Sequence, residues 1–162
     1  MRAQWPRLTA LLLGLGLMGC GPSGLRPERG ISSALQRSSD SRRWPSMGNR
    51  WLASIASRNG RERVELVDLR NGQPVPLPGI NQADAQPISV SVSADGNRIA
   101  LIRSRDGRTE LMLYRRGVGI LQRLPVEPAG VPREVSLDGS GRLLAVQVSR
   151  QGRWDVDLIR LP

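Results

Sequence analysis

The sequence predicts an all-β protein that folds as a short series of similar four-stranded antiparallel sheets. Three observations predict this: a pentapeptide that recurs at nearly constant spacing, apolar residues that alternate with polar ones, and Asn-Gly or Asp-Gly pairs between the alternating segments. The chain has 162 residues, which is enough for one modest globular domain. No segment of 10 or more residues has a convincing amphipathic helical pattern.

An apolar segment near the N-terminus is typical of a secretion signal. Residues 8–18 form an apolar run of 11 residues after a short positively charged region. This run is too short to cross a bilayer, which takes about 20 apolar residues. Residues 17–20, Leu-Met-Gly-Cys, resemble a bacterial lipobox, in which the Cys is diacylated and becomes the first residue after cleavage. We therefore expect residues 1–19 to be a lipoprotein signal peptide and Cys20 to be lipidated.

Cysteine usage supports this expectation. Cys20 is the only cysteine of the chain, so it can form no internal disulfide, and lipidation gives it a role. The alternative is an ordinary signal peptide with a chance Cys near its end. Residues 20–43 are rich in Gly, Pro, Ser and Arg, which predicts a flexible tether after the lipidated Cys. Within this tether only Ile31 to Leu35 could become ordered.

The rest of the chain is repetitive. The pentapeptide Ser-Arg-x-Gly-Arg begins at Ser57, Ser104 and Ser149, at intervals of 47 and 45 residues. An Ala stands four residues before each Ser, and aliphatic residues stand seven and nine residues after it: Val64 and Leu66, Leu111 and Leu113, Val156 and Leu158. A period of about 40 to 50 residues is typical of blade-like β repeats. The repeats divide residues 44–162 into units of about 44–87, 88–132 and 133–162.

Each unit reads as a four-stranded meander. In the second unit the expected strands are residues 88–93, 98–104, 109–115 and 120–124. Tight turns with positive φ are expected at Asn59-Gly60, Asn71-Gly72, Asp95-Gly96, Asp106-Gly107 and Asp138-Gly139. The large aromatic residues of the repeats, Trp44, Trp51, Trp154 and Tyr114, are expected to pack within or between the sheets.

These residues resemble a known repeat family. Residues 92–100, followed by Ser-Arg-Asp-Gly at 104–107 and Glu-Leu-Met-Leu at 110–113, resemble the WD-like β-propeller repeat of TolB and of prolyl-oligopeptidase propellers. The resemblance covers about residues 40–162 and implies a partial β-propeller of about three blades. It implies no particular activity, because propellers carry many unrelated functions.

Three blades leave the ring open. Propellers usually close with four to eight blades, and the third unit here ends after three strands at Pro162. Two copies could close a six-bladed ring around a two-fold axis. Alternatively, Ile31 to Leu35 could supply the missing outer strand, or the chain could be a remnant of a longer propeller.

Composition and motifs exclude several kinds of chemistry. All 24 basic residues are Arg, with no Lys and no His, so the chain has no imidazole base and no amine for a Schiff base. It also has no G-x-S-x-G elbow, no S-x-x-K motif and no D-x-D-x-D-G loop. We therefore expect no catalytic residues, no cofactor and no metal site.

The arginine excess suggests a binding surface. The formal net charge is +10, and the equivalent hairpins of all blades emerge on one side of a propeller. Six arginines of the repeated pentapeptide should therefore share one face: Arg58, Arg61, Arg105, Arg108, Arg150 and Arg153. Such a face suits anionic lipid, cell-wall polymer or an acidic protein. The alternative is that they are turn residues of a repeat biased toward Arg. Nucleic acid is disfavoured, because the aromatic platforms that stack bases are missing.

Together these features predict a non-enzymatic lipoprotein of the bacterial envelope, anchored in the membrane and facing the periplasm, with the outer membrane preferred. Its propeller repeats would bind or scaffold a protein partner, as the TolB resemblance implies. TolB's own partner contacts do not transfer, because the sequence shows no match to its N-terminal α/β domain. The alternative is an accessory or remnant domain related to oligopeptidase propellers that works with a separate enzyme chain.

Overall fold

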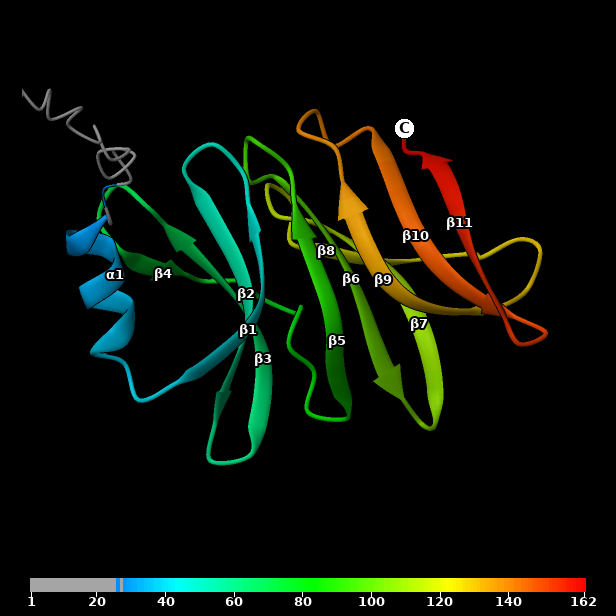
Figure 1. The fold of residues 1–162 in the computed structure, drawn as a ribbon, viewed down its shortest axis with the longest axis horizontal. Coiled ribbons are helices and arrows are strands. Elements are labelled where there is room, and N and C mark those ends of the chain that lie inside the picture. The colour runs from blue at the N-terminus through cyan, green and yellow to red at the C-terminus, as the bar shows by residue number, and fades with distance from the viewer. Residues whose placement is uncertain (1–25, 27) are drawn as a thin grey trace, which may run out of the picture.

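A computed structural model describes residues 26 and 28–162, which form one helix and three antiparallel sheets that stand side by side as blades (Figure 1). Blade 1 contains β1 (Ser41–Met47), β2 (Trp51–Arg58), β3 (Arg61–Asp68) and β4 (Gln73–Val75). Blade 2 contains β5 (Ala85–Val92), β6 (Arg98–Arg105), β7 (Arg108–Arg115) and β8 (Ile120–Leu124). Blade 3 contains β9 (Val131–Leu137), β10 (Leu143–Arg150) and β11 (Arg153–Arg160). The predicted all-β fold, a partial propeller of three blades, is confirmed.

The pentapeptide forms the hairpin between the second and third strand of each blade. Its x and Gly positions both have positive φ: 53° and 77° at Asn59 and Gly60, 49° and 72° at Asp106 and Gly107, 48° and 79° at Gln151 and Gly152. Two successive left-handed residues form a type I′ turn, whose twist matches that of antiparallel strands. This requirement explains why all three copies keep Gly at the second of these positions.

Side chains close the turns between the first and second strands of blades 2 and 3. The Ser93 hydroxyl and the Asp138 carboxylate each accept a hydrogen bond from the backbone N–H five residues later, at 3.0 and 2.8 Å. Ser93 and Asp138 are therefore equivalent residues. The predicted tight turn at Asp138-Gly139 is wrong by two residues, because Asp138 is the side chain that closes the turn. The positive φ of 70° belongs to Gly141.

Two apolar layers fill the spaces between the blades. Alternation along each strand lets the central sheet contribute to both layers, since Leu101 faces blade 1 and Ile102 faces blade 3. Blades 1 and 2 enclose Ile55, Leu66, Ile99, Leu101 and Tyr114, among others. Blades 2 and 3 enclose Ile102, Leu111, Leu113, Leu144 and Val146, among others. Each fully buried side chain of this kind contributes about 1.5 to 3 kcal/mol.

The segment before blade 1 differs from the prediction. Residues 29–36 form α1 (Arg29–Gln36), which lies beside blade 1 on the side away from blade 2 (Figure 1). The idea that Ile31 to Leu35 supplies a missing outer strand is therefore wrong. The predicted tether of residues 20–43 contains α1 and the start of β1, so order within it extends beyond the Ile31 to Leu35 segment for which it was expected. Ile31 and Leu35 are one helical turn apart, so both fall on the same side of the helix.

The aromatic residues do not all pack as expected. Trp51 and Tyr114 are buried between blades 1 and 2, and the Tyr114 hydroxyl donates to the Pro78 carbonyl at 3.0 Å. Trp44 and Trp154 are instead 44% and 60% exposed. The packing prediction is thus correct for the two aromatic side chains that lie between blades and wrong for the two on outer surfaces.

Candidate functional site

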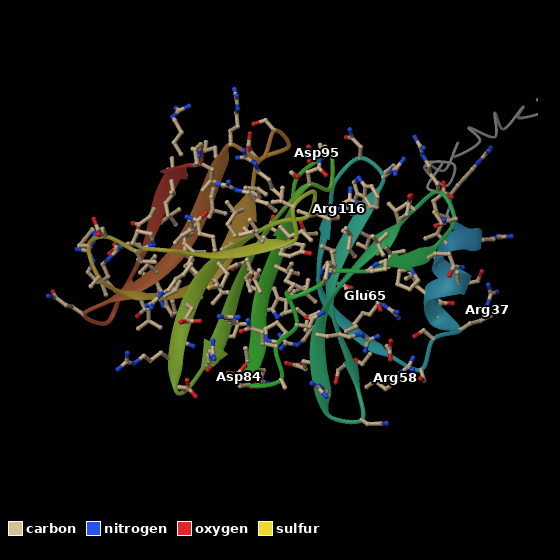
Figure 2. The ribbon with its side chains drawn as sticks, turned by 180° about the vertical axis from the view of Figure 1, so that it is seen from behind. Arg37, Arg58, Glu65, Asp84, Asp95 and Arg116 are labelled. Atoms are coloured by element: carbon tan, nitrogen blue, oxygen red, sulfur yellow. The ribbon has the colours of Figure 1, made fainter. Side chains whose placement is uncertain are left out.

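The six predicted arginines of the repeated pentapeptide lie along one edge of the blade stack, which we call the hairpin edge. They occupy the β2–β3, β6–β7 and β10–β11 hairpins: Arg58 and Arg61, Arg105 and Arg108, Arg150 and Arg153. Figure 2 shows Arg58 and Asp84 toward this edge, whereas Asp95 and Arg116 lie toward the opposite edge. The six residues thus occupy equivalent hairpin positions along this edge, but most of them have carboxylate partners, which the sequence pattern did not predict.

In blade 1 a buried carboxylate neutralises the charge of an arginine in the β2–β3 hairpin. The Asp40 side chain is only 2% exposed and accepts hydrogen bonds from Arg58 at 2.5 Å and Arg63 at 2.6 Å. These bonds, that of Arg58 first, lower the pKa of Asp40 to about 2. Arg63 also contacts Glu65 at 3.2 Å, and Glu65 pairs with Arg42 at 2.8 Å. The cluster ties the segment after α1 to the sheet of blade 1.

Blades 2 and 3 also pair hairpin arginines with carboxylates, although these carboxylates are more exposed than Asp40. Arg105 pairs with Asp84 at 2.6 Å, Arg153 pairs with Asp155 at 3.1 Å, and Arg150 pairs with Asp157. The hydrogen bond from Arg150 lowers the pKa of Asp157, and the same bond raises the pKa of the guanidinium. Among the described ion pairs, none involves Arg61 or Arg108. The hairpin edge therefore carries local pairs of opposite charge, and it presents no continuous cationic face of six residues.

A polar groove of about 450 Å³ separates the hairpins of blades 1 and 2. Its walls include Arg61, Glu62, Asp84 and Arg105. Glu62 is held by Arg43 at 2.8 Å, and this bond lowers the pKa of Glu62. Because both signs of charge line the groove, it suits a polar segment that carries both charges better than a simple anion.

On the opposite edge, two arginines stack on one tryptophan. The guanidinium carbons of Arg50 and Arg116 each lie 4.4 Å from the ring centroid of Trp51. Arg116 also donates to the Gly96 carbonyl at 2.8 Å. A Cβ at Gly96 would lie 2.5 Å from the Trp51 ring, so only glycine fits there. Sequence reasoning missed this stack, because its members come from three separate turns.

Blade 3 ends the stack with an exposed apolar face. On the side away from blade 2, which we call the distal face of blade 3, lie Leu143, Trp154, Val156 and Leu158. Val156 and Leu158 are each 68% exposed, whereas their equivalents Leu111 and Leu113 in blade 2 are 1% exposed. The alternating pattern predicts Val156 and Leu158 as the apolar residues of a half-buried strand, and the structure leaves both of them uncovered.

The remaining site predictions concern metal and lipid. Within residues 28–162 no three His, Cys, Asp or Glu side chains come together as metal ligands could. The one helix in this part of the chain is also too short to cross a membrane. Cys20, the predicted lipidation site, lies outside the described residues, so its modification stays a prediction.

Comparison with known proteins identifies the fold. No protein-family model matches the chain, and no curated protein matches it. Among solved structures, TolB from Acinetobacter baumannii is similar with a TM-score of 0.57 and 20% identity, over 72% of this chain and 29% of that one. A protein assigned as TolB in Agrobacterium tumefaciens has a TM-score of 0.59 and 15% identity, over 75% and 46%. The β-propeller domain of the Trilobed protease from Pyrococcus furiosus, described as having an open velcro topology, has a TM-score of 0.51 and 12% identity, over 76% and 43%.

These similarities confirm the TolB-like and peptidase-type propeller resemblance at the level of the fold. The chain spans less than half the length of each of these three structures. At 12 to 20% identity the match concerns blade architecture alone.

Proposed function

We propose that this chain is a non-enzymatic lipoprotein of the bacterial cell envelope whose partial propeller binds a protein partner in the periplasm, with the outer membrane as its preferred anchor site. One observation carries the proposal: a TolB-type blade stack follows closely after residues 17–20, which resemble a lipobox. Cys20 and the start of α1 at Arg29 are nine residues apart, a span of at most about 30 Å. An acylated Cys20 would therefore keep the blades beside the lipid surface.

Three arginines near the anchor support a contact with lipid. Arg26, Arg29 and Arg37 are exposed, and none of them takes part in the described ion pairs. Near an anionic membrane each such charge contributes about 1 kcal/mol. We assign the lipid contact to these residues in place of the hairpin edge, where four of the six arginines already have carboxylate partners.

Five described carboxylates are held in the ionised state, which does not suit a general acid. Arginines lower the pKa of Asp40, Glu62 and Asp157, and turn groups lower the pKa of Asp95 and Asp138. A general acid needs the opposite shift, toward neutral pH. These carboxylates therefore serve as ionised acceptors that hold the blades and turns in place.

A second candidate function rests on the similarity to the propeller domain of the Pyrococcus furiosus Trilobed protease. In this alternative the chain is an accessory propeller that works with a separate peptidase chain. The two candidates differ in the identity of the partner, which is an envelope protein of the Tol or Pal type in the first case and a peptidase in the second.

The test combines lipid labelling with cross-linking on membranes. We expect radiolabelled palmitate to enter the wild-type chain and not the C20S variant, and the wild type alone to sediment with membranes. Cross-linking mass spectrometry on these membranes should then recover an envelope protein with the wild-type chain and lose it with C20S. Equal labelling of both chains would contradict the anchor, and recovery of a peptidase would favour the second candidate.

A further inference from the structure

The distal face of blade 3 has two covered equivalents in the same molecule. In blade 1 the same positions are Val64 and Leu66, which are 2% and 0% exposed. They are covered because β5, the first strand of blade 2, packs across β1, β2 and β3. In the same way β9, the first strand of blade 3, packs across β5, β6 and β7. The structure thus shows twice what covers this kind of face, namely the first strand of the following blade.

A serine hydroxyl fastens each covering strand. The Ser46 hydroxyl accepts a hydrogen bond from the backbone N–H of Val92 at 3.1 Å, and the Ser91 hydroxyl accepts one from Leu137 at 2.9 Å. The partners are 46 residues apart in both cases. The donor in both contacts is a backbone N–H of the covering segment. Inside a helix this N–H would already bond to a carbonyl of the same helix, so the contact favours an extended strand.

Blade 3 carries the next serine in this series. Ser46 pairs in register with Ala53, Ser91 with Ala100, and Ser136 with Ala145. Ser136 therefore occupies the same position as the two fastening serines, and it is exposed. The apolar side chains and the hydroxyl acceptor that hold a following blade are thus all present on the distal face of blade 3.

Blade 1 of a second copy does not fit this face. Register places Ser54 opposite Glu65 in blade 1, where blade 2 has the apolar pair Leu101 and Met112. Glu65 is engaged in ion pairs, and α1 lies over this side of blade 1 (Figure 1). Docking of a second copy there would displace the helix and bury charge against an apolar face, which is costly. The six-bladed ring from two copies, which stays a prediction, would need this contact twice.

We propose that the distal face of blade 3 is a docking surface for the first strand of a further β-propeller blade carried by a partner polypeptide. The partner strand presents aliphatic side chains at alternate positions to Val156 and Leu158, and it donates a backbone N–H to Ser136. The inference deepens the proposed function by naming the kind of partner. Its test uses the purified chain alone, so its failure would leave the membrane experiments above unaffected.

The probe is the chain's own third blade, because that blade already docks in this way on blade 2. Residues 116–162 are appended after Arg160, which places the appended Arg116 in register 45 residues after the original. The appended residues supply an outer strand for blade 3, the connection that follows such a strand in the natural chain, and a fourth blade. Because the link is covalent, docking of the fourth blade is intramolecular. A C20S background removes the only cysteine, so that V156C in the original blade reports exposure through its reaction with a maleimide.

We expect the extension to slow maleimide labelling of V156C by about tenfold or more, because a covered thiol reacts only when the blades separate. The matched control is V118C, since Val118 lies in the β7–β8 turn and is 65% exposed; its labelling rate should not change. Adding L158E should restore fast labelling of V156C in the extended chain.

Three results would overturn the proposal. The first is unchanged labelling of V156C in the extended chain while hydrogen exchange shows a folded fourth blade. The second is a fourth blade that stays unfolded when this face is offered to it. The third is a dimer of the unextended chain that is abolished by L158E, because a second copy would then be the occupant.

Discussion

The buried carboxylate that joins the α1 segment to blade 1 allows a quantitative prediction for D40N. Asp40 is 2% exposed, and Arg58 and Arg63 lower its pKa from 3.8 to about 2. This difference corresponds to about 2.4 kcal/mol in the free energy of unfolding at neutral pH. Water around Arg58 and Arg63, which are 53% and 36% exposed, reduces the value to about 1 to 2 kcal/mol.

The pH dependence of the same variant has a definite sign. A carboxyl whose pKa is lower in the folded state stabilises the fold above its unfolded pKa, and the stabilisation is lost as pH falls through the folded pKa. For Asp40 this window runs from about pH 5 down to about pH 2. The difference between wild type and D40N should therefore be largest at pH 7 and about half as large at pH 3.

Urea unfolding followed by circular dichroism at pH 7, 5, 4 and 3 measures this difference. The matched control is D84N, because Asp84 is 49% exposed and pairs with Arg105 at 2.6 Å; exposed pairs contribute about 0 to 1 kcal/mol. A cost of D40N no greater than that of D84N, or a cost that is constant from pH 7 to pH 3, would refute the reasoning.

Three further predictions concern turns and contacts between blades. Q151N should raise the free energy of unfolding by about 0.5 to 1 kcal/mol in thermal denaturation, because Asn tolerates a φ of 48° better than Gln, and N59Q should lower it by a similar amount; changes of equal sign would contradict this. S91A should cost about 1 to 3 kcal/mol in urea unfolding, since it leaves a buried amide of β9 without an acceptor. S136A, at the exposed equivalent position, should leave the free energy of unfolding unchanged. Equal effects of S91A and S136A would show that the hydrogen bond from Leu137 to Ser91 does not contribute to stability. Y114F should cost about 1 kcal/mol by the same assay, because it removes a 3.0 Å hydrogen bond to a backbone carbonyl; an unchanged midpoint would argue against that bond.

The strands could be predicted because the repeat fixes them locally. The x-Gly pair in each pentapeptide sets the hairpin, and the alternation on either side sets which residues face the neighbouring blades. Helix α1 was missed because its eight residues lie in a stretch whose Gly, Pro, Ser and Arg content favours a flexible segment, and because an isolated helix this short is only marginally stable. Gly141 was missed because Asp138-Gly139 has the same composition as a tight turn, although Asp138 serves as the closing side chain.

Charge neutralisation at the hairpin edge could not be predicted from spacing. Asp40 and Arg58 meet only because the segment after α1 folds back along blade 1, and Arg150 meets Asp157 only through the register of β10 and β11. The exposure of Trp154 could not be predicted from the sequence either, because it depends on whether another blade covers the distal face of blade 3. Local pattern thus determines each blade, whereas the charge and exposure of its surfaces depend on neighbouring elements.

The position of α1 gives the blade stack a direction. Each blade has one side that receives the preceding blade and one that receives the following blade, so an uncapped stack could add copies head to tail without limit and form fibres. Because α1 and the Arg42–Glu65 ion pair lie on the receiving side of blade 1, a copy could be added head to tail at blade 3 only if its own α1 were displaced. The helix therefore occupies the place of the polar capping repeats that end other repeat proteins, and it leaves blade 3 as the uncapped end of the stack.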